Sequence, residues 1–294
     1  MNRTNLRWFL RLLMLVSIAW LSGCSSIRLA YDNADIWIRW RADHYLELRG
    51  EQRVALNARI VELLSWHRQD ALPRYAGYLD EAARRLADGL TRQDLAWAYE
   101  AARAHLRQDV LAAGAKAGDM LKALDAAQVA HLERRFAEDN QKYAREYISG
   151  SEEKRREKRA ERNAERIEDW LGRLTDEQTE RIKRHSDEQP LIDELRDRER
   201  KRLQTEFLSL ARQRKGPDDL AALLLQLIPG GGDPKYVAAA QVYLDSYMEL
   251  LVDVSRTATA RQRQRAVARL QGYARDLTQL HFARKTGQAQ HSQP

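Results

Sequence analysis

The only cysteine of the 294-residue chain, Cys24, has neighbours that determine what its thiol can do. It directly follows Leu21, Ser22 and Gly23, and an apolar run over residues 12–21 leads up to them. A lone cysteine cannot form an intramolecular disulfide, but its thiol can accept a lipid chain. The apolar run would span roughly 15 Å as a helix, about half of a bilayer's hydrocarbon core, and the residues before it carry three arginines and no acid. This layout predicts an export signal rather than a permanent membrane span.

Residues 21–24 resemble a lipobox, the motif at which the leader of a bacterial lipoprotein is cut. The resemblance implies that Leu21, Ser22 and Gly23 are recognised by the signal peptidase and that Cys24 receives a diacylglyceryl thioether. It also implies acylation of the new amino terminus, with palmitate as an example. Two or three acyl chains anchor a protein durably, whereas one chain binds only marginally. The alternative is an ordinary secretory signal with a chance cysteine.

The leader divides the chain into three expected parts. Residues 1–23 would be the signal peptide, residues 24–284 a helical periplasmic domain, and residues 285–294 a disordered tail. The sorting rule of enterobacterial lipoproteins uses aspartate after the lipidated cysteine as a retention signal, and this chain has Ser25 there. We therefore expect a protein anchored by lipid at the periplasmic face of the outer membrane.

The sequence offers little for catalysis or metal binding. No histidine lies four residues from another, as a helical zinc pair requires, and there is no Gly-x-Ser-x-Gly nucleophile motif. Lipidation would consume the thiol of Cys24. We therefore expect no enzyme activity, no catalytic residue, no cofactor and no metal. The histidines considered are His44, His67, His105, His131, His185, His281 and His291.

The formal net charge of +7 falls to +4 once the three arginines of the leader are removed, which is too little to indicate a nucleic-acid partner. Residues 256–275 nevertheless form a strongly basic stretch without an acid, which includes Arg261, Arg265 and Arg269. These arginines could bind anionic lipid head groups or a polyanionic envelope polymer. The alternative is a solvated face of an ordinary amphipathic helix.

Apolar residues recur at spacings of three and four along the whole mature chain, and no proline occurs between Pro73 and Pro190. This pattern predicts an all-α fold, an elongated multi-helix bundle of about eight or nine helices with one long charged helix. Pro73 is expected to kink or split the second helix. The predicted helices cover residues 26–46, 51–88, 92–122, 125–169, 175–188, 190–214, 217–228, 234–255 and 259–284.

Within the fourth of these helices, residues 151–169 carry seven basic and seven acidic side chains and no large apolar residue before Ile167. Acidic and basic side chains form two adjacent rows at helical spacing, and each acid–base pair adds only about 0.2–0.5 kcal/mol to the stability of the helix. We interpret the segment as a solvated helix that projects from the body. The alternative is an arm that docks a partner.

A leucine followed four residues later by a glutamine recurs at three predicted helix starts, beginning at Leu48, Leu124 and Leu174. In the third copy Thr175 and Gln178 form a capping box, and Thr259 with Gln262 repeats it. The pattern resembles the Leu-Thr-x-x-Gln signature of small periplasmic chaperones, which implies a chaperone-like activity. Ordinary helix capping produces the same residue pattern and is the preferred interpretation.

Four aromatic residues lie close to the lipid anchor in sequence: Tyr31, Trp37, Trp40 and Tyr45. Tryptophan and tyrosine favour the head-group layer of a membrane, where an apolar ring and a polar edge are both satisfied. The alternative is core packing between the first two helices.

The lipobox, the segment 31–35 with its nearby tryptophans, the step from Leu48 to Gln52, and residues 66–68 and 72–75 together resemble a family of Gram-negative lipoproteins known only as a domain of unknown function. The resemblance implies a helical lipoprotein and transfers no catalytic residue. We therefore expect a non-enzymatic envelope structural or interaction module whose partners are membrane lipid, an envelope protein or a polyanionic polymer. The alternative function is a periplasmic chaperone-like or envelope-stress binding protein.

Overall fold

The structure is a computed structural model that describes residues 26–283. The lipobox residues Leu21 to Cys24, the signal peptide and the tail 285–294 lie outside the described residues. The predicted all-α fold is confirmed, because every regular element in residues 26–283 is helical. The elements are α2 (Ser26–Asp32), α3 (Ala34–Leu46), α4 (Gly50–Trp66), η1 (His67–Ala71, π-helical), α5 (Leu72–Ala87), α6 (Arg92–Lys122), α7 (Ala126–Tyr143), η2 (Ala144–Ile148, π-helical), α8 (Glu152–Leu171), α9 (Asp176–Glu188), α10 (Asp193–Arg212), α11 (Pro217–Leu225), α12 (Pro234–Arg256) and α13 (Ala260–Phe282).

The structure divides the first and the fourth of the predicted helices and leaves the second continuous. The first divides at Asn33, and the fourth divides at Gly150, whose positive φ of 100° lets the chain turn before the side chain of Ser151 caps α8. The second is continuous through Pro73. The π-helical η1 directly precedes α5, the amide of Leu72 donates to the carbonyl of His67, and Pro73, the next residue, has no amide to donate. The predicted split at Pro73 therefore does not occur, and a π-helical segment lies just upstream instead.

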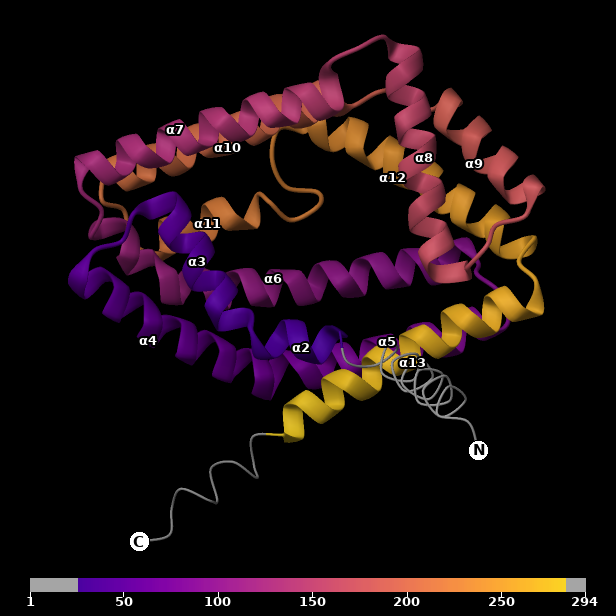
Figure 1. The fold of residues 1–294 in the computed structure, drawn as a ribbon, viewed down its shortest axis with the longest axis horizontal. Coiled ribbons are helices and arrows are strands. Elements are labelled where there is room, and N and C mark those ends of the chain that lie inside the picture. Colours follow the sequence, from indigo (N-terminus) through magenta and orange to yellow (C-terminus); the bar gives the residue numbers. More distant parts are fainter. Residues whose placement is uncertain (1–25, 284–294) are drawn as a thin grey trace, which may run out of the picture.

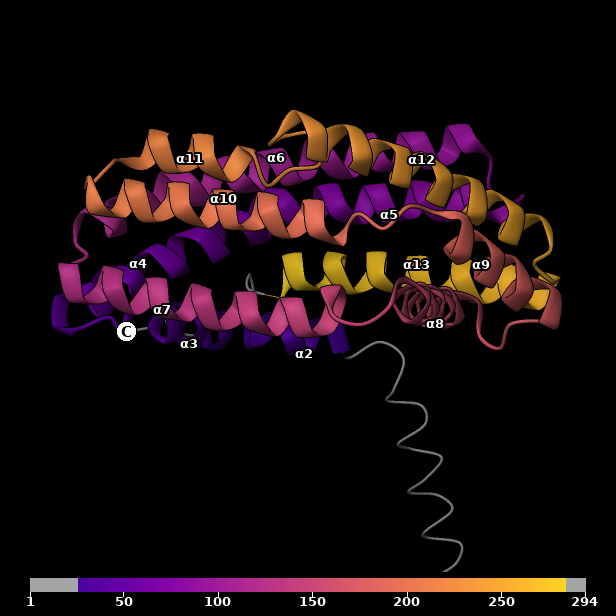
Figure 2. The same ribbon diagram turned by 90° about the horizontal axis from the view of Figure 1, so that it is seen from above.

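The helices form a flat molecule (Figures 1 and 2). In Figure 1, α7 and α10 follow one long edge, α5 and α13 follow the opposite edge, and α8 and α9 cross one end. Figure 2 shows α6, α11 and α12 toward one broad side and α2, α3, α7 and α8 toward the other. The first helices therefore lie on one broad side of the molecule.

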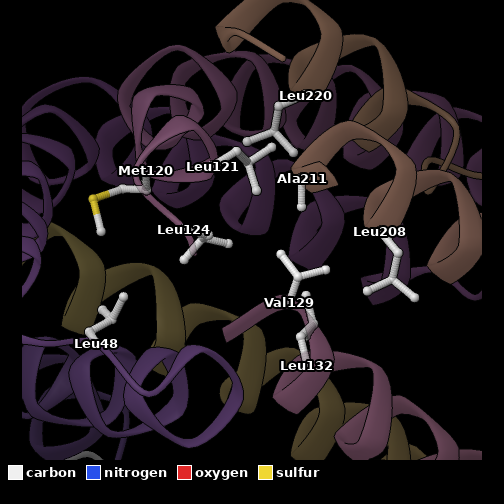
Figure 3. Packing of buried hydrophobic residues seen from close by; sticks show 9 residues of the cluster. All are labelled: Leu48, Met120, Leu121, Leu124, Val129, Leu132, Leu208, Ala211 and Leu220. Carbon is white, nitrogen blue, oxygen red and sulfur yellow. The ribbon is translucent and has the colours of Figure 1, made fainter. Parts of the chain in front are cut away.

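The largest hydrophobic cluster holds the start of α4 against the end of α6, the start of α7, α10 and α11 (Figure 3). Leu48 and Leu124, two leucines of the repeated leucine–glutamine pattern, are each at most 3% exposed and lie inside this cluster. Burial of one such leucine contributes about 1.5–3 kcal/mol. The nine residues of the cluster are Leu48, Met120, Leu121, Leu124, Val129, Leu132, Leu208, Ala211 and Leu220.

The glutamines of the capping boxes pair with one another across the fold. Gln178 closes its own capping box by accepting from the amide of Thr175 at 3.0 Å, and its Nε2 donates to Oε1 of Gln262 at 3.1 Å. Gln262 closes the box of Thr259 and donates back to Oε1 of Gln178 at 3.0 Å and to the carbonyl of Arg173 at 3.0 Å. This reciprocal amide pair fastens the start of α9 to the start of α13.

The same arrangement occurs a second time. Gln52 and Gln128 exchange hydrogen bonds of 3.0 and 2.8 Å, and each closes the box at the start of its own helix. Their amides also reach the preceding loop of the other helix, at the carbonyls of Ala123 and Leu46. The starts of α4 and α7 are thus joined as those of α9 and α13 are. The capping interpretation is confirmed, and the pairing is a further feature that it did not include.

The charged helix α8 does not project from the body. It packs against α9, and Arg155, Arg159, Asn163 and Ile167 form a buried stripe along it. Arg159 donates to the carbonyls of Ser186, Gln189 and Pro190 at the end of α9, which satisfies carbonyls that the helix leaves unpaired. The interpretation as a projecting solvated helix is therefore wrong, because arginine can be buried where backbone acceptors meet it.

The surroundings of Gly118, where α6 packs on α11, and of Gly77 predict opposite effects of alanine substitution on stability. A Cβ on Gly118 would lie 2.1 Å from Cα of Pro217, whereas a Cβ on Gly77, in α5, would meet nothing within 4 Å. Gly118→Ala should lower the free energy of unfolding by about 1–3 kcal/mol, because a backbone must move. Gly77→Ala should raise it by about 0.5–1 kcal/mol. Urea unfolding of both variants checks this pair, and equal effects would contradict the packing.

Candidate functional site

An apolar surface lies at the beginning of the described chain. Leu29, Ile36, Trp37 and Trp40 expose 67, 60, 62 and 56% of their surface, and we call them the apolar face. Asn33 interrupts the helix only slightly, because its amide donates to the carbonyl of Leu29 and its carbonyl accepts from Trp37. The spacing of the four residues along this helical path places them on one side of it. Two tryptophans and two aliphatic residues in contact with solvent form an exposed apolar surface.

The four aromatic residues singled out from the sequence divide into two pairs. Trp37 and Trp40 belong to the apolar face, whereas Tyr31 and Tyr45 turn inward. The hydroxyl of Tyr31 lies 3.1 Å from Nδ1 of His67, and that of Tyr45 donates to Asp139 on α7. The helix period explains the split, because residues 31 and 45 fall on the side of the path that packs against α7 and η1. A surface role is therefore open to the tryptophans and not to the tyrosines.

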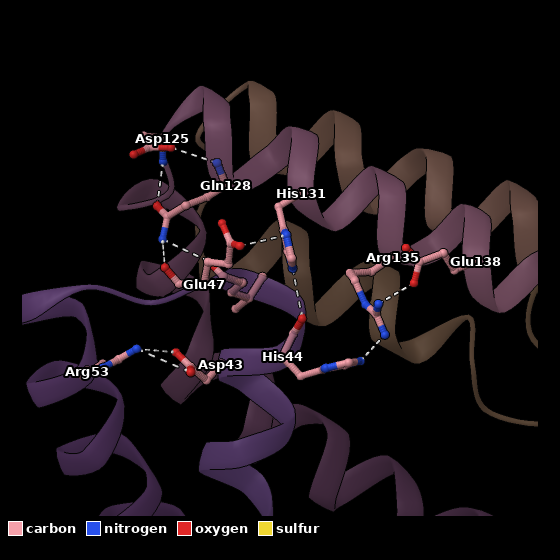
Figure 4. A network of polar contacts seen from close by, with 10 residues as sticks. Asp43, His44, Glu47, Arg53, Asp125, Gln128, His131, Arg135 and Glu138 are labelled. Carbon is pink, nitrogen blue, oxygen red and sulfur yellow. Dashed lines mark hydrogen bonds and ion pairs between the residues drawn. The ribbon is translucent and has the colours of Figure 1, made fainter.

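Side chains of α7 hold the carboxyl end of α3 (Figure 4). His131 lies 3.0 Å from the carbonyl of His44 through Nε2 and 3.1 Å from the carboxylate of Glu47 through Nδ1. Gln128 donates to the carbonyl of Glu47 at 3.1 Å, and Arg135 contacts the ring of His44. These contacts bind backbone acceptors that the end of α3 leaves free. The helix that bears Ile36, Trp37 and Trp40 of the apolar face is therefore fixed at its carboxyl end by α7.

Histidine and aromatic side chains gather around η1. His67 stacks on Tyr31 with ring centroids 5.7 Å apart, and His105 meets the edge of Tyr75 at 5.5 Å. Arg74 connects the group, at 3.2 Å from Nδ1 of His105 and 3.8 Å from the carboxylate of Asp109. The residues brought together here include several that carry the family resemblance in the sequence. Sequence spacing could not show that His67 and His105 share a cluster, because they lie on different helices.

Burial shifts the pKa values of the histidines and the aspartate in this cluster. It lowers the pKa of His67 and of His105, and the positive charge of Arg74 lowers both further. Burial raises the pKa of Asp109, and Arg74 opposes that shift. Neutral imidazoles between aromatic rings are suited to packing and to hydrogen bonding with tyrosine. Among residues 26–283, no three His, Cys, Asp or Glu side chains come together as a metal site.

The lowered histidine pKa values predict a pH dependence of stability. In the unfolded chain these rings take up protons below about pH 6.5, whereas the folded state resists protonation, so stability falls as the pH drops from about 7.5 to 5.5. His185, whose pKa burial also lowers, adds to the slope, and Asp109 opposes it only at lower pH. The variant His67→Gln/His105→Gln should show a flatter slope of melting temperature against pH. An unchanged slope would contradict this assignment.

The basic stretch on α13 is partly engaged within the fold. Arg269 donates to the carbonyl of Asp169 at the end of α8 and to the hydroxyl of Tyr273, and its guanidinium lies 4.9 Å from the Trp170 ring centroid. Arg261 and Arg265 are exposed and form no ion pair with any residue in the described range. Of the three arginines named for the predicted basic face, Arg261 and Arg265 thus remain open to an anionic partner.

In the part of the chain that the structure covers, no helix has both the length and the apolar character needed to cross a membrane.

The comparisons with known proteins give one match: the model of a family of unknown function, DUF6279, matches residues 44–229. No curated protein and no solved structure matches the chain. The matched range includes Gln52, η1 and Gln128 and leaves out the lipobox and the apolar face.

Proposed function

The chain belongs to a family of unknown function, DUF6279, and we propose that it is a lipid-anchored envelope protein that acts by binding rather than by catalysis. In this proposal Cys24 carries the lipid, the body faces the periplasm from the outer membrane, and the apolar face lies in the head-group layer. The observation that carries the proposal is the exposure of Trp37 and Trp40 on α3, which begins at Ala34, ten residues after Cys24.

The distance along the chain supports a membrane contact. Leu29 is the fifth residue after Cys24, and an extended chain covers at most about 3.5 Å per residue, so Leu29 lies within roughly 17 Å of the proposed anchor. A body held this closely cannot avoid the bilayer surface. Tryptophan is the residue that most favours that layer, and both tryptophans are presented to it.

Charge next to the apolar face favours an anionic membrane. The guanidinium of Arg41 lies 5.9 Å from the ring centroid of Trp37 and 4.8 Å from that of Tyr45. A cation beside an inserted indole can pair with a lipid phosphate while its stem stays on the ring. Arg261 and Arg265, on α13, remain available for an envelope protein or a polyanionic polymer.

Vesicle binding tests the apolar face. A mature chain that lacks lipid should bind vesicles of phosphatidylethanolamine and phosphatidylglycerol weakly, and Trp37→Ser/Trp40→Ser should reduce the partition coefficient by about tenfold or more, given the value of two large apolar groups. Leu227→Ser/Val242→Ser is the matched control, because these residues are exposed on or next to helices of the opposite broad side. Equal losses in both variants would contradict the proposal.

The exposed apolar residues also favour a second candidate, a chaperone-like binder of unfolded chains. This candidate predicts that the lipid-free mature protein suppresses aggregation of a reduced client protein and that Trp37→Ser/Trp40→Ser abolishes the suppression. Light scattering measures it. No suppression at equimolar protein would exclude the chaperone-like candidate and leave the membrane contact as the role of the face.

A further inference from the structure

A cavity of about 500 Å³ lies between α5, α6, α8, α12 and α13, away from the apolar face. Most of its lining is aliphatic, including Leu86, Leu95, Ile167, Leu251, Val254 and Leu270. Its volume is in the range of small-ligand sites, which is about 300–1,000 Å³. An apolar cavity gains little from water, so an apolar guest is the favoured content.

Three charged residues also line the cavity: Arg166, Asp169 and Arg263. Arg166 and Asp169 are exposed, whereas Arg263 is half-buried and its Nε is buried without a hydrogen-bond partner. The surplus of one positive charge favours an anionic group at this place.

Arg263 differs from the other arginines that have an unpaired buried Nε. The guanidinium groups of Arg135 and Arg155 pair with Glu138 and Glu194, that of Arg159 donates to carbonyls, and that of Arg200 donates to Asn140. Within residues 26–283 the side chain of Arg263 makes no hydrogen bond or ion pair at all. A cation left partly desolvated and without a partner is unfavourable, and an anionic ligand would relieve it.

Aromatic groups stabilise one wall of the cavity. The ring of Trp170, which lines it, contacts the guanidinium of Arg269 at 4.9 Å and makes an edge-to-face contact with the ring of Tyr273 at 6.1 Å. Ser255, another lining residue, already accepts from the amide of Leu90 at 2.8 Å. Away from Arg263 the lining is mainly aliphatic and aromatic, which suits a hydrocarbon chain.

We propose that this cavity binds a single-chain amphiphile with an anionic head group. The hydrocarbon chain lies among the aliphatic side chains, and the carboxylate or phosphate of the head group pairs with Arg263, with Arg166 nearby. A neutral ligand would leave Arg263 unpaired. The inference is independent of the lipid anchor, because every residue that carries it belongs to the folded body.

Calorimetric titration of the mature chain tests the proposal, with Cys24→Ser used to keep it free of lipid and detergent. The ligands are oleate, oleoyl-lysophosphatidylglycerol and oleyl alcohol, which share a chain and differ in the head group. We expect saturable one-to-one binding of at least one anionic ligand, at least tenfold tighter than that of the alcohol. The tighter of the two anionic ligands identifies a free fatty acid or a lysophospholipid as the source.

Two single arginine variants sharpen the test. Arg263→Gln should weaken anionic binding at least tenfold and leave the alcohol unchanged, whereas Arg184→Gln, on an exposed residue of α9 outside the cavity lining, should change neither. Ala98→Phe, which fills the cavity, should abolish binding of all three, with melting temperatures used to show that each variant folds. No saturable binding below about 100 µM, equal affinity for the alcohol, or equal losses in the two arginine variants would overturn the proposal.

Discussion

Gln178→Ala is expected to lower the free energy of unfolding by about 2–4 kcal/mol. Gln178 is fully buried, and its amide closes the capping box of α9 and pairs with Gln262. Its removal leaves the amide of Thr175 unpaired and takes an acceptor at 3.0 Å from Gln262. Buried polar groups that lose a partner are more costly than the hydrogen bond itself contributes. Urea unfolding followed by circular dichroism measures the change.

Gln264→Ala, two residues from Gln262 on the exposed side of α13, is the control and should change stability by no more than about 0.5 kcal/mol. The double variant Gln178→Ala/Gln262→Ala should lose less than the sum of the two single losses, because the two side chains share their hydrogen bonds. A loss below about 1 kcal/mol for Gln178→Ala, or additive losses, would show that the pair does not hold α9 to α13.

Local chemistry explains which parts of this fold could be predicted from sequence. The capping boxes at Thr175 and Thr259 need only three consecutive residues beyond the cap, and the structure has both where they were predicted. The pairing of their glutamines joins residues 84 positions apart, and no local pattern contains that information. The first helices, for the same reason, could be placed in the sequence but not on a particular side of the molecule.

The errors have physical causes that involve particular residues. Arg159 belongs to a segment with equal numbers of acids and bases, which is typical of a solvated helix, yet it lies 6% exposed because the end of α9 supplies carbonyl acceptors. Trp37 and Tyr45 have similar sequence surroundings and opposite exposures, since only the helix phase relative to α7 separates them. The cavity beside Arg263 needs five helices to enclose it, so no single segment predicts it.

Cys24→Ala is expected to remove the protein almost completely from the outer-membrane fraction. Without the thiol no diacylglyceryl group can be attached, and the leader is not cut at this site, so an uncleaved precursor that retains residues 1–23 should accumulate. Immunoblots of separated inner and outer membranes measure both the size and the location. Globomycin, which blocks cleavage of the leader, should make the unchanged chain accumulate as a precursor that also retains residues 1–23.

A second altered version of the protein distinguishes the effect of lipid anchoring from the effect of export. When residues 1–24 are replaced by an ordinary cleavable secretory leader, the body should be exported without lipid and be recovered mainly in the soluble periplasmic fraction, because one apolar face binds membranes only weakly. Normal processing of Cys24→Ala, or the same outer-membrane location for both altered chains, would contradict anchoring through this residue.

The mass of the peptide that begins at Cys24 and ends at Arg28, released by trypsin from purified membranes, tests the lipid anchor most directly. The account predicts that this peptide carries a diacylglyceryl group and an acylated amino terminus, and that no peptide from residues 1–23 is found in the mature protein. An unmodified peptide, or a mature chain cut at another position, would contradict it.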